Sequence, residues 1–210
     1  MAGTNQAVAS ARNPSGPWAG VDVGGSRKGF DVAIVDEERV VAIAPRRRAP
    51  ADVLEVLARH RPRVVAIDSP CSAAPDGAGL RECERELARA VCGIRWTPDR
   101  ATLDGGNPYH EWIRLGLGLY EALQAKGWRA IEVFPTASWT RWAGPRTGSR
   151  AAWTRAALPR LGLRDLPARA HQDVRDAIAA AVTARQHARG ETEGFGPIAV
   201  PRPGPPAPLR

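Results

Sequence analysis

The amino-acid sequence predicts an α/β fold, and two features of its apolar pattern support that fold class. Three short apolar segments separated by turn residues open the chain, which is typical of consecutive antiparallel strands. Segments at helical spacing then alternate with two further apolar runs, which is typical of a sheet covered by helices. Because 210 residues with 43% hydrophobic content bury one full core, we expect a single domain.

The first three strands are expected at residues 18–23, 30–35 and 39–44. Each is a short run rich in Val, Ile and Ala, and Gly24 and Gly25 supply a turn between the first two. Short connections of this kind predict that the three strands pair antiparallel.

The remaining elements alternate in type. Residues 50–59 carry apolar side chains at helical spacing, whereas 64–67 is a short apolar run between two prolines. The former predicts a helix and the latter a fourth strand. Further helices are expected at 80–91, 109–126 and 174–189, and a fifth strand at 130–134.

Both ends of the chain have the composition of tails. Residues 1–17 mix Ala, Asn, Ser, Gly and Pro without a period, and residues 201–210 are rich in proline. Segments of this composition bury too little apolar surface to fold. We therefore expect disordered tails at 1–17 and 201–210 around one folded domain at 18–200.

The charge balance favours an anionic partner such as nucleic acid. The formal net charge is +8, and a positive field attracts phosphates and raises encounter rates. Much of this excess is arginine in a chain rich in Ala, Gly and Pro, a composition that a GC-rich genome also produces. The charge is therefore consistent with nucleic-acid binding without requiring it.

The cysteine content points to a reducing compartment. Cys71, Cys83 and Cys92 are odd in number and have no CxxC spacing, which indicates neither a disulfide framework nor a zinc knuckle. No apolar stretch approaches the ~18 residues that a membrane span needs, and the N-terminus lacks the apolar core of a signal peptide. We expect a soluble, cytoplasmic protein with no membrane partner.

Acidic residues lie where predicted elements end or begin. Asp22 falls in the first strand and Asp68 ends the fourth, while Asp173 and Asp176 open the last helix. Carboxylates at the edge of a sheet form divalent metal sites, and hard oxygen ligands suit Mg²⁺ or Mn²⁺. Structural roles stay open as well: turn residues for the strand acids, and an N-cap with a first-turn acid for the helical pair.

The helical pair carries a further signal. Asp173 and Asp176 stand three residues apart and so share one face of the helix, with Ala177, Ala180 and Ala184 close beside them. Small residues there would let the helix approach the sheet.

Glu132 interrupts the apolar run of the predicted fifth strand. A buried carboxylate is costly without a partner, and either a metal ion or an arginine would satisfy it. The alternative is simple alternation, with Glu132 on a solvated face between inward-pointing Ile131 and Val133.

Five sequence blocks, in order along the chain, resemble those of the DUF429 family of predicted ribonuclease H-like nucleases and together span about residues 18–200. The blocks are Gly-Val-Asp-Val-Gly-Gly (20–25), Ala-Ile-Asp-Ser-Pro (66–70), Arg-Glu-Cys-Glu (81–84), Ile-Glu-Val-Phe-Pro (131–135) and Asp-Val-Arg-Asp-Ala-Ile-Ala-Ala-Ala (173–181). The last block also resembles the terminal helix of Holliday-junction resolvases, where an Asp-x-x-Asp-Ala pair completes the metal site.

This resemblance implies a ribonuclease H-like domain with a mixed five-stranded sheet, three antiparallel strands followed by two parallel ones, flanked by helices. In that fold the first and fourth strands lie side by side, which would bring Asp22 and Asp68 together. Asp22 is then the expected bridging ligand of two metal ions, and Asp68 with Asp173 and Asp176 supplies the other ligands. Glu132 joins these four acids as a candidate catalytic residue.

The resemblance also implies that Arg81 and Glu84 face the site. Arg81 would hold a phosphate, and Glu84 would support metal or substrate. Because they stand three apart on one predicted helix, a local ion pair is the alternative. His171 lies close enough to the acidic pair to assist proton transfer, whereas the run 46–48 of three arginines is most simply a solvated loop.

Tryptophan and arginine alternate between Ser138 and Arg155. Such residues suit base stacking and phosphate contact. Trp139 and Trp142, at three-residue spacing, equally suit packing of a helix on the core, and this is the interpretation we favour.

These observations predict a metal-dependent nuclease that hydrolyses phosphodiesters through a carboxylate-bound two-metal site. One alternative is a basic nucleic-acid-binding or scaffold module with a degenerate site. Another is an actin- or sugar-kinase-like phosphotransferase, since residues 22–26 with Lys28 resemble its first phosphate loop. That architecture needs two such domains, and this chain has the length for one unless a homodimer supplies the other. The sequence leaves open the oligomeric state and the substrate, which is DNA, RNA, a branched nucleic acid or a smaller phosphoester.

Overall fold

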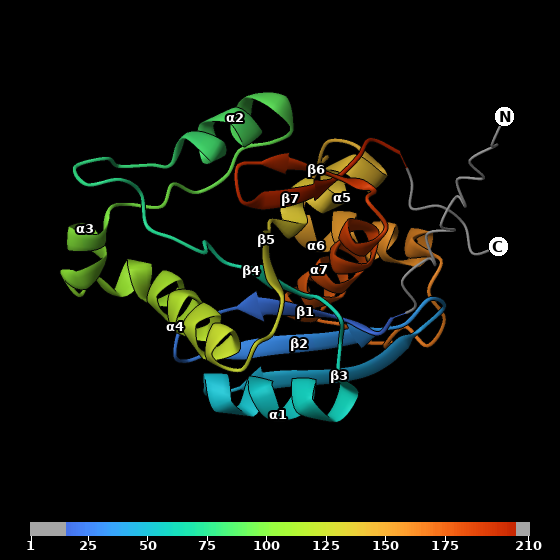
Figure 1. The fold of residues 1–210 in the computed structure, drawn as a ribbon. Helices are drawn as coiled ribbons and strands as arrows, with labels where there is room; N and C mark the ends of the chain where they lie inside the picture. The colour runs from blue at the N-terminus through green and yellow to red at the C-terminus, as the bar shows by residue number, and fades with distance from the viewer. Residues whose placement is uncertain (1–15, 205–210) are drawn as a thin grey trace, which may run out of the picture.

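One mixed β-sheet forms the centre of the protein (Figure 1). The structure is a computed structural model that describes residues 16–204, so the predicted tails lie largely outside the described residues. Within that range the strand order is β3-β2-β1-β4-β5-β7-β6. The strands are β1 (Trp18–Val23), β2 (Phe30–Val35), β3 (Val40–Arg47), β4 (Val65–Asp68), β5 (Ala130–Val133), β6 (Thr192–Phe195) and β7 (Ile198–Pro201).

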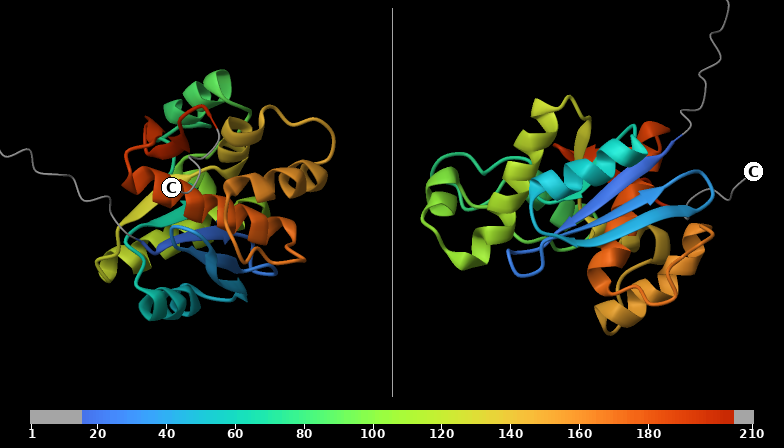
Figure 2. Two further views of the ribbon diagram at one scale, coloured as in Figure 1. Left: turned by 90° about the vertical axis from the view of Figure 1, so that its right-hand side faces the viewer. Right: turned by 90° about the horizontal axis from the view of Figure 1, so that it is seen from below.

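The helices cover both faces of this sheet, as Figure 2 shows from two further sides. They are α1 (Pro50–His60), α2 (Glu82–Ala90), α3 (Arg100–Asp104), α4 (Glu111–Ala125), α5 (Pro135–Ala143), α6 (Arg150–Ala157) and α7 (Gln172–Ala188), with short 3-10 turns η1 (Pro108–His110) and η2 (Leu158–Leu161). One apolar core joins α1 and α4 to the sheet, and a second core on the opposite face contains α5, α6 and α7. A smaller cluster packs α2 against β6 and β7.

The predicted pairing of the first five strands is confirmed. β1 pairs antiparallel with β2, and β2 pairs antiparallel with β3. β4 lies parallel to β1 on one side and to β5 on the other. The mixed arrangement of three antiparallel strands and two parallel ones is therefore present.

The predicted number of strands is wrong, because the described sheet has seven strands rather than five. β7 adds parallel to β5, and β6 pairs antiparallel with β7 as a hairpin. Each of these strands has only four residues, β6 contains Gly194, and β7 ends at Pro201, where a tail was expected. Short strands with glycine or proline give a weak periodic signal.

Helix α7 packs closely across the middle of the sheet because the residues that face each other on the helix and the strand are small. A Cβ built on Gly20 of β1 would lie 2.1 Å from the carbonyl oxygen of Ala177 and 2.2 Å from the backbone nitrogen of Ala181. The alanine face of α7 is fully buried, as the small residues of this helix predict. A side chain at position 20 would collide with the backbone of α7, so glycine is required there for this close packing.

The tryptophans of the arginine-rich segment belong to the core. Trp139 and Trp142 lie on α5 and Trp153 on α6, and all three are buried beside α7. Their ring packing, with Trp139 and Trp142 in an edge-to-face arrangement at 5.5 Å, confirms the core interpretation. No helix in the described range is long and apolar enough to span a bilayer.

Candidate active site

Asp22 and Asp68 are direct partners across the parallel pair of strands β1 and β4. Both lie near the C-terminal ends of their strands. Alternation places Asp22 on the same face as Gly20, and Asp68 on the same face as Ala66, which packs in the core beside α7. The two carboxylates therefore lie side by side at the C-terminal ends of two central strands, under the first turns of α7.

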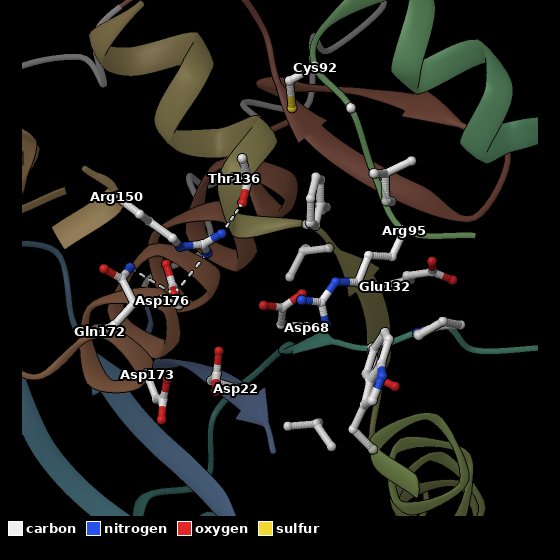
Figure 3. A pocket seen from close by; sticks show the side chains of 18 of the residues that line it. Asp22, Asp68, Cys92, Arg95, Glu132, Thr136, Arg150, Gln172, Asp173 and Asp176 are labelled. Atoms are coloured by element: carbon white, nitrogen blue, oxygen red, sulfur yellow. Dashed lines mark hydrogen bonds and ion pairs between the residues drawn. The ribbon is translucent and has the colours of Figure 1, made fainter. Parts of the chain in front are cut away.

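The first two turns of α7 add a second pair of acids. Asp173 and Asp176 both line the pocket that contains Asp22 and Asp68 (Figure 3). The close approach of the helix at Gly20 brings this pair to the strand ends. All four predicted metal ligands thus line one pocket, although they come from three segments that are far apart in sequence.

Electrostatic repulsion marks this cluster. The pKa of Asp22 is raised well above its ordinary value, first by burial and then by the negative charges of Asp68 and Asp176. Burial, followed by the charge of Asp176, raises the pKa of Asp68 to about 8. Carboxyls that resist ionisation in this way favour a bound cation, which would offset both the repulsion and the lost hydration.

Asp176 is held in place by three donors. Its Oδ1 accepts a hydrogen bond of 2.9 Å from the indole nitrogen of Trp139, and its Oδ2 accepts bonds of 2.9 Å from Arg150 and from Gln172. Arg150 also donates to the hydroxyl of Thr136 at 2.6 Å. These contacts, of which Figure 3 marks those of Arg150 and Gln172, fix the carboxylate of Asp176 beside the strand acids.

Asp173 pairs instead with a cation from the hairpin turn. The ammonium group of Lys28 lies 2.9 Å from Oδ2 of Asp173, at a partly solvated position. The pair neutralises Asp173 in this structure, whereas the ion pairs of the described residues include neither Asp22 nor Asp68.

Glu132 has an arginine as its partner. Arg81 donates two hydrogen bonds to it, at 2.8 Å and 2.5 Å, and the backbone N–H of Cys71 donates a third at 2.9 Å. Of the two partners that the sequence allowed, metal or arginine, the structure provides the arginine. The solvated-face alternative is excluded, because Glu132 is only 4% exposed.

Arg81 and Glu84 form the local ion pair that their spacing allowed. Arg81 donates to Oε1 of Glu84 at 3.0 Å, and Glu84 also accepts from the backbone N–H of Thr97 at 3.0 Å and from its hydroxyl. Both residues are buried and line the same pocket as the acids. Their predicted contact with substrate or metal remains a prediction.

The sequence interpretation missed Asp31, which lies on β2 directly opposite Asp22. Asp31 is 2% exposed, and one of its oxygens lies 3.5 Å from Nε2 of His171. Ligand atoms of Asp31, His171 and Asp173 all lie within 4.8 Å of one another. The signal that could have revealed Asp31 is its place as a polar residue inside the apolar run of β2.

The donor set of the site fits a hard divalent cation. Asp22, Asp68, Asp173 and Asp176 offer only carboxylate oxygens, which Mg²⁺ and Mn²⁺ prefer. The three cysteines are free thiols, and burial raises the pKa of each. The acids line a pocket of about 1020 Å³, which has room for a ligand besides the ions.

The fold and this pocket define an α/β protein with a carboxylate cluster at the end of a mixed sheet. The chain belongs to the DUF429 family: the family model, described as a protein of unknown function, matches residues 20–199.

Two solved structures are similar to this chain. One is the structure of RuvC from Thermus thermophilus, with 19% identity, coverage of 82% of this chain and 95% of that chain, and a TM-score of 0.45. The other is T. thermophilus RuvC in complex with a Holliday junction substrate, with 20% identity, coverage of 82% and 94%, and a TM-score of 0.47. No curated protein matches the sequence.

Proposed function

We propose that this protein is a metal-dependent nuclease of ribonuclease H-like type. The observation that carries the proposal is the juxtaposition of Asp22 and Asp68 in register at one sheet edge, facing two further acids of α7. Asp22 and Asp68 both have a raised pKa, and within residues 16–204 neither has an ion-pair partner, so ionising them is costly unless a cation binds.

Asp22, Asp68, Asp173 and Asp176 are the residues that would hold Mg²⁺ or Mn²⁺. Divalent ions at such a site neutralise charge on a phosphoryl group and make water a better nucleophile. Asp22 is in register with Asp68, and the charges of Asp68, Asp176 and Asp173 all raise its pKa, which supports a bridging role for this residue.

The surrounding residues hold the acids in position. Trp139, Arg150 and Gln172 fix both oxygens of Asp176, so its carboxylate is oriented before any ligand enters. The Arg81–Glu132 pair fills the adjoining wall of the pocket. We propose that Glu132 supports catalysis through this pair, by holding Arg81 where a phosphate can approach it.

The contacts of the first turn weigh against a phosphotransferase of the kinase type. The backbone N–H of Ser26, which a phosphate loop would offer to a nucleotide, donates to Glu111 at 3.0 Å. Lys28 is paired with Asp173. A scaffold with a degenerate site is disfavoured because all four predicted acidic ligands line the pocket. The experiment below distinguishes this alternative from a nuclease.

The test combines metal titration with cleavage. Mg²⁺ and Mn²⁺ are titrated by calorimetry into the parent, into Asp22→Asn and into Asp76→Asn, an exposed acid outside the pocket. We expect binding and cleavage of DNA or RNA by the parent and by the Asp76 control, and loss of both in Asp22→Asn. Equal cleavage by Asp22→Asn would exclude this site, and absence of binding and cleavage with either ion would favour the scaffold.

A further inference from the structure

The basic side chains that line the pocket divide into two groups. Lys28, Arg81 and Arg150 each form an ion pair with an acid of the site. Arg95 and Arg146 also line the pocket, yet within residues 16–204 neither is engaged in an ion pair. Both are solvent-exposed and lie in the segments that follow α2 and α5. These two guanidinium groups are therefore available to an anionic ligand.

Two exposed aromatic residues neighbour Arg95, one in the sequence and one in space. Trp96 follows it directly and is 45% exposed, and Tyr109 of η1 is 57% exposed. The guanidinium carbon of Arg95 lies over the ring of Tyr109, 5.8 Å from its centroid. Figure 3 shows Arg95 entering the pocket from the side of the view opposite Gln172 and Asp173. We call Arg95, Trp96 and Tyr109 the aromatic rim.

The exposure of the rim contrasts with the burial of the tryptophans on α5 and α6. Trp139, Trp142 and Trp153 are at most 8% exposed and pack in the core. An aromatic ring left in water forgoes the stabilisation that burial would give, so two such rings beside an unpaired arginine suggest a ligand-binding surface. Aromatic rings interleaved with arginine suit the stacking of nucleobases and contacts to phosphates.

We propose that the aromatic rim stacks the unpaired bases of a single-stranded nucleic acid whose backbone is contacted by Arg146, which also lines the pocket. The substrate class of the site is then single-stranded nucleic acid rather than continuous duplex. The faces of bases are hidden inside a duplex and become available to side chains only when the strand is unpaired. The inference rests on the proposed function for the identity of the ligand, but the binding it describes does not require catalysis.

The test measures binding without cleavage. Fluorescence anisotropy in the presence of EDTA is recorded for Asp22→Asn protein with a labelled oligo(dT), an oligo(U) and a mixed-sequence duplex of the same length. In this background Trp96→Ala, Tyr109→Ala and Arg146→Ala are compared with two controls outside the pocket, Val41→Ala and Arg59→Ala. Both control positions are exposed. Trp96→Phe and Tyr109→Phe keep a ring for stacking and serve as rescue variants.

Removal of either ring is expected to weaken single-strand binding by about 5-fold or more and to leave duplex binding nearly unchanged. The phenylalanine variants should restore most of the affinity. Arg146→Ala should reduce the slope of log K against log salt concentration by roughly the amount that one phosphate contact contributes. Arg59→Ala should leave this slope unchanged. The relative affinity for oligo(dT) and oligo(U) would show whether DNA or RNA is preferred.

Unchanged single-strand affinity in Trp96→Ala and Tyr109→Ala would overturn the proposal, as would equal losses on single strand and duplex. The proposal would also be overturned if the Asp22→Asn protein with an intact rim bound neither oligo(dT) nor oligo(U) measurably. If rim-dependent binding is observed but the parent cleaves nothing with Mg²⁺ or Mn²⁺, the rim assignment stands and only the nuclease proposal fails.

Discussion

The indole N–H of Trp139 donates a hydrogen bond of 2.9 Å to Oδ1 of Asp176. A tryptophan that belongs to the core thus also orients a candidate metal ligand. Because both residues are almost fully buried, this bond couples the packing of α5 to the geometry of the site.

Trp139→Phe is expected to destabilise the fold by about 1–3 kcal/mol, since a donor to a buried carboxylate is lost. It should also weaken Mn²⁺ binding about 10-fold, as is typical when a residue that orients a ligand is removed. Urea unfolding and calorimetry check the two effects. Trp142→Phe is the matched control, because the indole nitrogen of Trp142 has no hydrogen-bond partner in the described part of the chain. Equal metal affinities in both variants would contradict the orienting role.

The free energy of unfolding of the metal-free protein is expected to fall as the pH rises toward 8. In the unfolded chain Asp68 loses its proton near its ordinary pKa of 3.8, whereas in the folded protein its pKa is about 8. Between these values the unfolded state binds fewer protons, so stability declines with pH. Urea unfolding in EDTA across this range measures the slope. Asp68→Asn should make it shallower, and an unchanged slope would rule out Asp68 as its source.

Glu132→Gln is expected to destabilise the protein by about 3 kcal/mol, because it removes one partner of a buried ion pair and leaves Arg81 with Glu84 alone. The matched control is Glu82→Gln in the solvated pair of Glu82 with Arg85, where the loss should be within about 1 kcal/mol. Chemical denaturation compares the two variants. Similar small losses would show that the buried pair contributes little.

Gly20→Ala is expected to be among the most damaging substitutions in the sheet, costing at least about 3 kcal/mol. Its added methyl group would meet backbone atoms of Ala177 and Ala181, which cannot rotate away as a side chain could. Gly118→Ala on α4 is the control, since nothing lies within 4 Å of the position that its methyl group would take and alanine favours a helix. Thermal unfolding of both variants should show a large loss for the first and little change or a gain for the second.

Residues that carry both a periodic pattern and a chemical reason were predictable from the sequence. Asp22 and Asp68 follow apolar runs, and the resemblance supplied the adjacency of their strands, which the register confirms. The partners of Asp176 were not predicted. Arg150 reaches it from α6, 26 residues away in sequence, and no local pattern encodes such a contact.

The elements that the sequence analysis missed lack a clear local signal, each for its own reason. α5 begins at Pro135 directly after β5, with only one residue between them, so the apolar run gives no boundary between strand and helix. β6 and β7 owe their place to pairing with each other and with β5 rather than to their own composition. Asp31, like Glu132, is a single acid inside an apolar run, but its place opposite Asp22 follows only from the pairing of β2 with β1.

The donors around Asp176 have a consequence for the choice of inactivating variants. Through Trp139, Arg150 and Gln172 this one carboxylate joins α5, α6 and α7, so it serves as an architectural anchor for the C-terminal half of the chain. Removing its charge would weaken the contacts among these three helices and would also affect any reaction at the site. Within residues 16–204 no hydrogen bond of this kind ties Asp22 to a helix. A variant at Asp22 therefore tests reactivity, whereas a variant at Asp176 tests reactivity and the packing of the helices together.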